Sequence, residues 1–96
     1  MIRNVVMAKL VADHDVDEVA SIQDGLRNLD LPGTLRYTVG SDASLREGNW
    51  DFVIVADFAD VDAYRAYDAD DAHNVLRARL APMVEQIARA QFEVPA

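Results

Sequence analysis

The chain has 96 residues, of which 51% are hydrophobic and 27% charged, so its composition predicts a single small folded domain over residues 1–96 and argues against disorder. Seventeen acidic against nine basic residues give a net charge of −8, which argues against binding to nucleic acid or to an anionic membrane surface. Because there is no cysteine, disulfides and thiolate metal sites are excluded. No apolar run reaches the roughly 18–20 residues of a membrane span, and no signal-like segment opens the sequence, so we expect a cytoplasmic protein.

The first half of the chain predicts a strand, a helix and a second strand. Residues Ile2 to Ala12 are β-compatible and apolar on both faces, which predicts a strand. Asp13 to Leu29 predicts a helix that Asp15 can cap, with an apolar stripe formed by Val19, Ile22, Leu26 and Leu29. The segment Thr34 to Val39 predicts a half-buried strand whose apolar face holds Leu35, Tyr37 and Val39.

The second half predicts a strand, two helices and a last strand. Trp50 to Phe58 is again apolar on both faces, and one face holds Trp50, Phe52, Ile54, Ala56 and Phe58. A short helix over Val61–Tyr67 precedes a second helix from about Asp70 to Ala81, whose stripe holds Leu76, Leu80 and Met83. Ile87 to Val94 predicts a strand whose polar face meets solvent and whose apolar face holds Ala88, Ala90, Phe92 and Val94.

The predicted element order is βαββααβ, which lacks the repeated βαβ units of a parallel sheet. It favours an α+β fold of the ferredoxin-like kind, with a four-stranded antiparallel sheet and helices on one side. Two strands are nevertheless apolar on both faces, and a chain of this size has nothing left to cover the second face. We therefore predict a C2 homodimer in which two sheets face each other.

One segment has a specific pattern of aromatic, acidic and histidine residues, Ala-Tyr-Arg-Ala-Tyr-Asp-Ala-Asp-Asp-Ala-His from Ala63 to His73. Together with residues 2–10, 22–29, 51–58 and 90–94, in this order and spacing, it resembles the stress-responsive A/B-barrel domain family, usually called Dabb. The segment from Ala63 to His73 is similar to the family's Tyr-x5-His motif, which ends in Ala-His. The resemblance covers nearly the whole chain and implies a dimeric α+β barrel.

The resemblance also implies a possible chemistry. Among the family's relatives are plant polyketide cyclases of the olivetolic acid cyclase type, in which a Tyr and a His spaced like Tyr67 and His73 perform an aldol cyclisation. This chain departs from the family at two places. Many members carry a histidine in the first strand where this chain has Asn4, and many have His-Pro where this chain has Asp70 and Asp71.

The strongest candidate site residue is His73, which lies on the apolar stripe of the predicted helix from about Asp70 to Ala81, together with Leu76 and Leu80. It is either a general base, with Tyr67 polarising a carbonyl, or a buried structural histidine, with Tyr67 filling the core. Either way, we expect Tyr67 and His73 to line one pocket between the second helical region and the sheet. The strand residues predicted around that pocket are Val6, Phe52 and Ile54 in the wall and Asn4 near the rim.

We predict no metal and no cofactor. The acidic cluster Asp13–Glu18 is spaced like a calcium loop but lacks its glycine and final glutamate, and two distant histidines do not make a zinc site. Two functions stay open. One is a homodimeric, stress-related barrel that binds a small apolar ligand or confers stability; the other is a cofactor-free cyclase or lyase that acts on a polyketide-like substrate through Tyr67 and His73. An open pocket that contains both polar tips favours the second, and a filled core favours the first.

Overall fold

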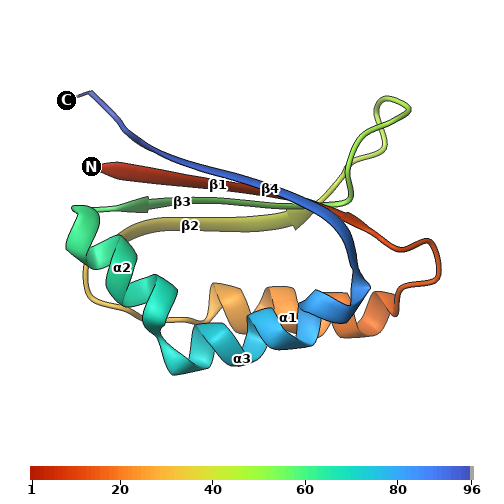
Figure 1. The fold of residues 1–96 in the computed structure, drawn as a ribbon, viewed down its shortest axis with the longest axis horizontal. Coiled ribbons are helices and arrows are strands. Elements are labelled where there is room, and N and C mark those ends of the chain that lie inside the picture. Colours follow the sequence, from red (N-terminus) through yellow and green to blue (C-terminus); the bar gives the residue numbers. More distant parts are fainter. Residues whose placement is uncertain (96) are drawn as a thin grey trace.

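The computed structural model describes residues 1–95, which form one antiparallel sheet with helices packed on a single face (Figure 1). The elements in chain order are β1 (Ile2–Leu10), α1 (Val16–Arg27), β2 (Thr34–Ser41), β3 (Phe52–Phe58), α2 (Val61–Ala69), α3 (Asp71–Leu80), the short 3₁₀ turn η1 (Ala81–Met83) and β4 (Val84–Glu93). The strand order is β2-β3-β1-β4, so the two strands predicted to be apolar on both faces are the two central ones. This confirms the predicted ferredoxin-like α+β fold.

Aspartates fix where the helices begin. The Asp15 side chain accepts hydrogen bonds from the backbone N–H groups of Asp17 and Glu18, so α1 begins at Val16, three residues after the predicted start. Asp70 separates α2 from α3, and its carboxylate accepts the backbone N–H of His73 at 2.9 Å. A single capping residue therefore sets both the break between the two helices and the position of His73.

The core lies between the helices and one face of the sheet. Three residues of the predicted stripe are buried in α1, namely Val19, Ile22, which is fully enclosed, and Leu26, which is 4% exposed. Leu29, the fourth, lies beyond the end of α1 and is half-buried. From the sheet, β3 contributes the alternating side chains Phe52, Ile54, Ala56 and Phe58, all buried. Within residues 1–95, no helix is long and apolar enough to cross a membrane.

Two predicted core positions are wrong. Leu35 is 60% exposed, because the β2–β3 register shifts between Thr34 and Arg36 and leaves Leu35 without a place on the inner face. Trp50 was predicted on the face of Phe52, but β3 begins only at Phe52. Trp50 instead lines a hollow with Met7 and Val53 on the other side of the sheet.

The last strand is also turned over relative to its prediction. It begins at Val84 rather than Ile87. Arg89 pairs with Val6 and Gln91 with Asn4, and directly opposite residues share a face. The polar side of β4 therefore faces the helices and its apolar side faces away from them.

The sheet face without helices, which we call the open face, is apolar at its centre and holds the Arg3–Asp57 ion pair near one end. Its residues alternate with the core residues of β1 and β3 and pair across three strands. Met7 is 45% and Phe92 48% exposed there. The apolar side chains of the open face are Val5, Met7, Val53, Val55, Ala88, Ala90 and Phe92.

Candidate functional site

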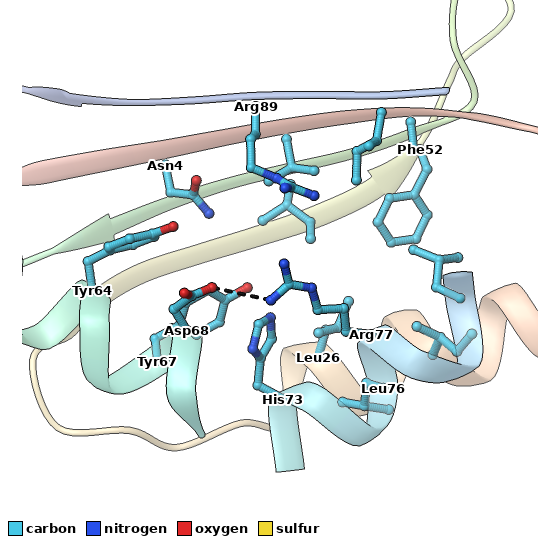
Figure 2. Close-up of a pocket in the computed structure, with 16 residues that line it drawn as sticks. Asn4, Leu26, Phe52, Tyr64, Tyr67, Asp68, His73, Leu76, Arg77 and Arg89 are labelled. Atoms are coloured by element: carbon cyan, nitrogen blue, oxygen red, sulfur yellow. Dashed lines mark hydrogen bonds and ion pairs between the residues drawn. The ribbon is translucent and has the colours of Figure 1, made fainter. Parts of the chain in front are cut away.

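A cavity of about 80 Å³ lies between the inner face of the sheet and the helices α2 and α3 (Figure 2). A volume of this size holds several water molecules. Its floor is apolar and is made by Val6, Ala8, Ile22, Leu26, Phe52, Ile54, Leu76 and Leu80. Tyr67, His73 and Asn4 also line it, so the six residues named from the sequence surround one space.

His73 lies in the wall of this cavity, in the first turn of α3. Its side chain is 7% exposed, and its ring stacks on that of Tyr67 with centroids 4.0 Å apart. Within residues 1–95, the enclosed Nδ1 atom has no hydrogen-bond partner. Because Nδ1 is enclosed, the ring presents its other edge, with Nε2, to the cavity (Figure 2).

The surroundings of His73 favour the neutral imidazole. Burial lowers the pKa of His73 below its ordinary value of 6.5, and the Arg77 guanidinium lowers it further. The carboxylates of Asp68 and Asp70 and the backbone of Asp68 act in the opposite direction, without reversing the shift. At neutral pH the ring is therefore uncharged and able to accept a proton or a hydrogen bond.

Tyr67 is held by a second tyrosine. The hydroxyl oxygens of Tyr67 and Tyr37 are 2.8 Å apart, and Tyr67 is 3% exposed. Burial raises the pKa of both phenols, so both stay protonated. One hydroxyl donates to the other; when Tyr37 donates, Tyr67 keeps its own hydrogen for a group in the cavity.

Asn4 is not at the rim, where we expected it. It is 3% exposed, and its Oδ1 accepts a hydrogen bond from Gln91 Nε2 at 2.8 Å. The reversed orientation of β4 supplies this partner. Asn4 is thus fixed in the wall with its carbonyl oxygen already engaged.

One tyrosine and three charged residues surround the opening of the cavity, which we call the mouth: Tyr64, Asp68, Arg77 and Arg89. The Arg77 Nη1 and Asp68 Oδ1 atoms are 3.3 Å apart, and both side chains are about half exposed. Neither arginine was predicted as a site residue. Arg77 follows His73 by four residues on one helix, a spacing that places both on one face, whereas Arg89 was hidden by the wrong orientation of β4.

Metal ligands do not gather at this site. Across the part of the chain that the structure describes, no three His, Cys, Asp or Glu side chains come together as a metal-binding group. Asp51, the residue before β3, accepts the backbone N–H of Leu10 at 2.9 Å.

Comparison with known proteins agrees with this fold. A structure from Thermobifida fusca, described as a dimeric ferredoxin-like protein of unknown function, is 30% identical with a TM-score of 0.90, covering 97% of this chain and 90% of that one. A dimeric ferredoxin-like protein from Bacteroides fragilis is 21% identical with a TM-score of 0.83, covering 97% and 95%. The hydroxynitrile lyase of Passiflora edulis is 14% identical with a TM-score of 0.82, covering 98% and 93%. The last two likenesses show the fold alone.

No curated protein matches the sequence. The family model described as Stress responsive A/B Barrel Domain matches residues 2–94, which is the family that the segment from Ala63 to His73 resembled. The protein therefore belongs to the stress-responsive A/B-barrel domain (Dabb) family.

Proposed function

We propose that the protein binds a small, largely apolar ligand in the cavity between sheet and helices, as a homodimer. The observation that carries the proposal is the His73 imidazole, which is buried in the cavity wall and uncharged, and whose Nδ1 has no hydrogen-bond partner among residues 1–95. A buried polar group without a hydrogen bond costs roughly 1–3 kcal/mol. A ligand that bonds Nε2 at the cavity edge of the ring gives the second ring nitrogen a partner, and the apolar floor takes the rest of the ligand.

The size of the cavity limits the ligand. Typical pockets for drug-sized molecules measure roughly 300–1,000 Å³, whereas this cavity measures about 80 Å³. A ligand of a few carbon atoms with one polar group matches it. The same volume counts against a polyketide-like substrate.

The homodimer is supported by the open face and by the relatives. Val5, Val53 and Val55 lie on a sheet face that none of the described helices covers, and contiguous apolar patches of this kind are rare on monomers. The similar structures from Thermobifida fusca and Bacteroides fragilis are described as dimeric. A second copy, placed face to face, buries both patches by one symmetric contact.

Binding is tested with 1-pentanol as the probe, followed by ¹H–¹⁵N NMR of the protein. We expect saturable shifts centred on His73, Leu76 and Phe52, with a Kd on the order of millimolar for so small a molecule. His73→Leu should weaken binding severalfold by removing the polar contact. The matched control is Val75→Leu, because Val75 lies on the same helix and is 61% exposed. An absence of saturable shifts at the cavity contradicts the proposal.

A second candidate is cofactor-free lyase or cyclase chemistry, and it is favoured by a cavity that both His73 and Tyr67 line. In the first step the C–H bond next to a carbonyl breaks, the proton goes to Nε2 of His73, and the resulting enolate oxygen is stabilised by the Tyr67 hydroxyl. We test this step with 2-pentanone in D₂O. If the protein is an enzyme, it should speed hydrogen exchange at the carbon next to the carbonyl. His73→Leu should slow this exchange by about 10²–10⁴, and Val75→Leu should leave it unchanged. Equal exchange rates with and without protein contradict the enzyme hypothesis.

A further inference from the structure

Two guanidinium groups converge on the mouth of the cavity from opposite walls. Arg77 reaches it from α3, and Arg89 reaches it from β4, as Figure 2 shows. Asp68 pairs with Arg77 only. Among the residues that the structure describes, Arg89 forms no ion pair.

This charge is the reverse of that of the whole protein. The chain carries 17 acidic and nine basic residues, yet the mouth holds two arginines against one aspartate. Two like charges that point into one partly enclosed space repel each other, and the repulsion grows as water is displaced. An anion between them removes the repulsion and satisfies both groups.

The backbone directs Arg89 to this place. Arg89 pairs with Val6 across the β1–β4 ladder, and Val6 packs against the core. The Arg89 side chain therefore leaves the sheet on the side of the helices, above the apolar floor, rather than on the open face. This placement beside the cavity distinguishes Arg89 from an arginine that serves only as a solvated surface charge.

We propose that the ligand is a small carboxylate with a short apolar tail, which deepens and rests on the function proposed above. The carboxylate lies between Arg77 and Arg89, since a guanidinium fork matches the two carboxylate oxygens. The tail extends over Ile54 and Leu76 toward His73. Inorganic phosphate satisfies the arginines but leaves the apolar floor unused, and a long fatty acid exceeds the volume.

The test compares three probes of equal length by NMR titration at pH 7.5 and low salt: pentanoate, pentanamide and pentylamine. We expect pentanoate to bind at least about tenfold tighter than pentanamide, because two charge-assisted hydrogen bonds replace neutral ones. Pentylamine should bind weakest, because the arginines repel it. The preference for pentanoate should fall as salt is raised, since the mouth is open to solvent.

Variants assign the effect to the mouth. Arg89→Gln should reduce the preference of pentanoate over pentanamide to roughly twofold, and Arg77→Gln should reduce it further because Asp68 is left unpaired there. The control is Arg65→Gln, since Arg65 is an exposed arginine of α2 that does not line the cavity. Equal binding of pentanoate and pentanamide contradicts the proposal that the ligand is a carboxylate, but it is consistent with the proposed binding of an apolar ligand. If none of the probes binds, both proposals fail.

Discussion

The neutral state of His73 has a consequence for stability. Burial and Arg77 lower the pKa of His73 in the folded protein below 6.5, while the imidazole of the unfolded chain takes up its proton near the ordinary value. The unfolded state therefore binds more protons between the two values, and folding stability falls as the pH drops below about 6.5. The loss stops once the pH is below the folded pKa.

Two measurements check this pH dependence. An NMR titration of the imidazole resonances should give His73 a pKa below 6.5. Urea unfolding between pH 8 and pH 5 should show a decrease in the free energy of unfolding that His73→Leu removes. A normal or raised pKa at His73 contradicts the argument from burial.

His73→Leu is also predicted to stabilise the protein. Leucine has a similar volume, and it removes the buried Nδ1 atom that has no partner in residues 1–95, a group that costs roughly 1–3 kcal/mol. The gain should be largest at pH 5.5, where the wild type is weakened by protonation. A variant that is less stable than the wild type at pH 8 shows instead that His73 has a structural role.

Single residues of the site were predictable to different degrees. Tyr67 and His73 were identified by the helical phase of His73 and by the family motif, and Phe52 and Ile54 by strand alternation. Asn4 was expected at the rim, because nothing in the sequence shows that Gln91 meets it across β4. Arg89 was missed for the same reason, because the orientation of an edge strand depends on its partner and not on its own pattern.

At the scale of elements, a close contact of α1 with α3 borders the cavity. A Cβ atom added at Gly25 would lie 2.6 Å from Leu76 Cδ2, and Leu76 lines the cavity. Gly25→Ala should therefore turn the Leu76 side chain toward the cavity and weaken 1-pentanol binding severalfold. The better helix propensity of alanine, about 1 kcal/mol, offsets the repacking cost, so stability should change by only about 1 kcal/mol.

A second substitution serves as the control for Gly25→Ala. Leu76→Val removes one methylene beside the new methyl group, so the double variant should recover probe binding. If Gly25→Ala binds 1-pentanol as the wild type does, α3 moves as a unit and the cavity does not depend on this contact.

The elements themselves were predicted well where local signals agree. The stripe of α1 and its Asp15 cap, the alternation of β3 and the break at Asp70 are all local. The predictions were wrong where the neighbouring strand determines the structure. The register shift at Leu35 is defined by pairing with β3, and the orientation of β4 is defined by pairing with β1.

At the scale of the whole molecule, the open face should hold two copies together. Val55→Lys introduces a charge at the centre of that face, opposite Val5, and should convert a dimer into a less stable monomer. Analytical ultracentrifugation at micromolar concentration measures the change. The control is Val75→Lys, on the exposed side of α3. A wild-type protein that sediments as a monomer, with no loss of stability on dilution, contradicts the dimer.

The position of Trp50 separates two spectroscopic signals. It is the one tryptophan of the chain and lines the hollow beside Met7 and Val53, so its fluorescence reports whether a second copy covers the sheet. The cavity, on the other side of the sheet, contains tyrosines and His73 but no tryptophan. Assembly can therefore be followed by selectively excited indole emission, and occupancy can be followed separately by the NMR signals of the cavity tyrosines and His73.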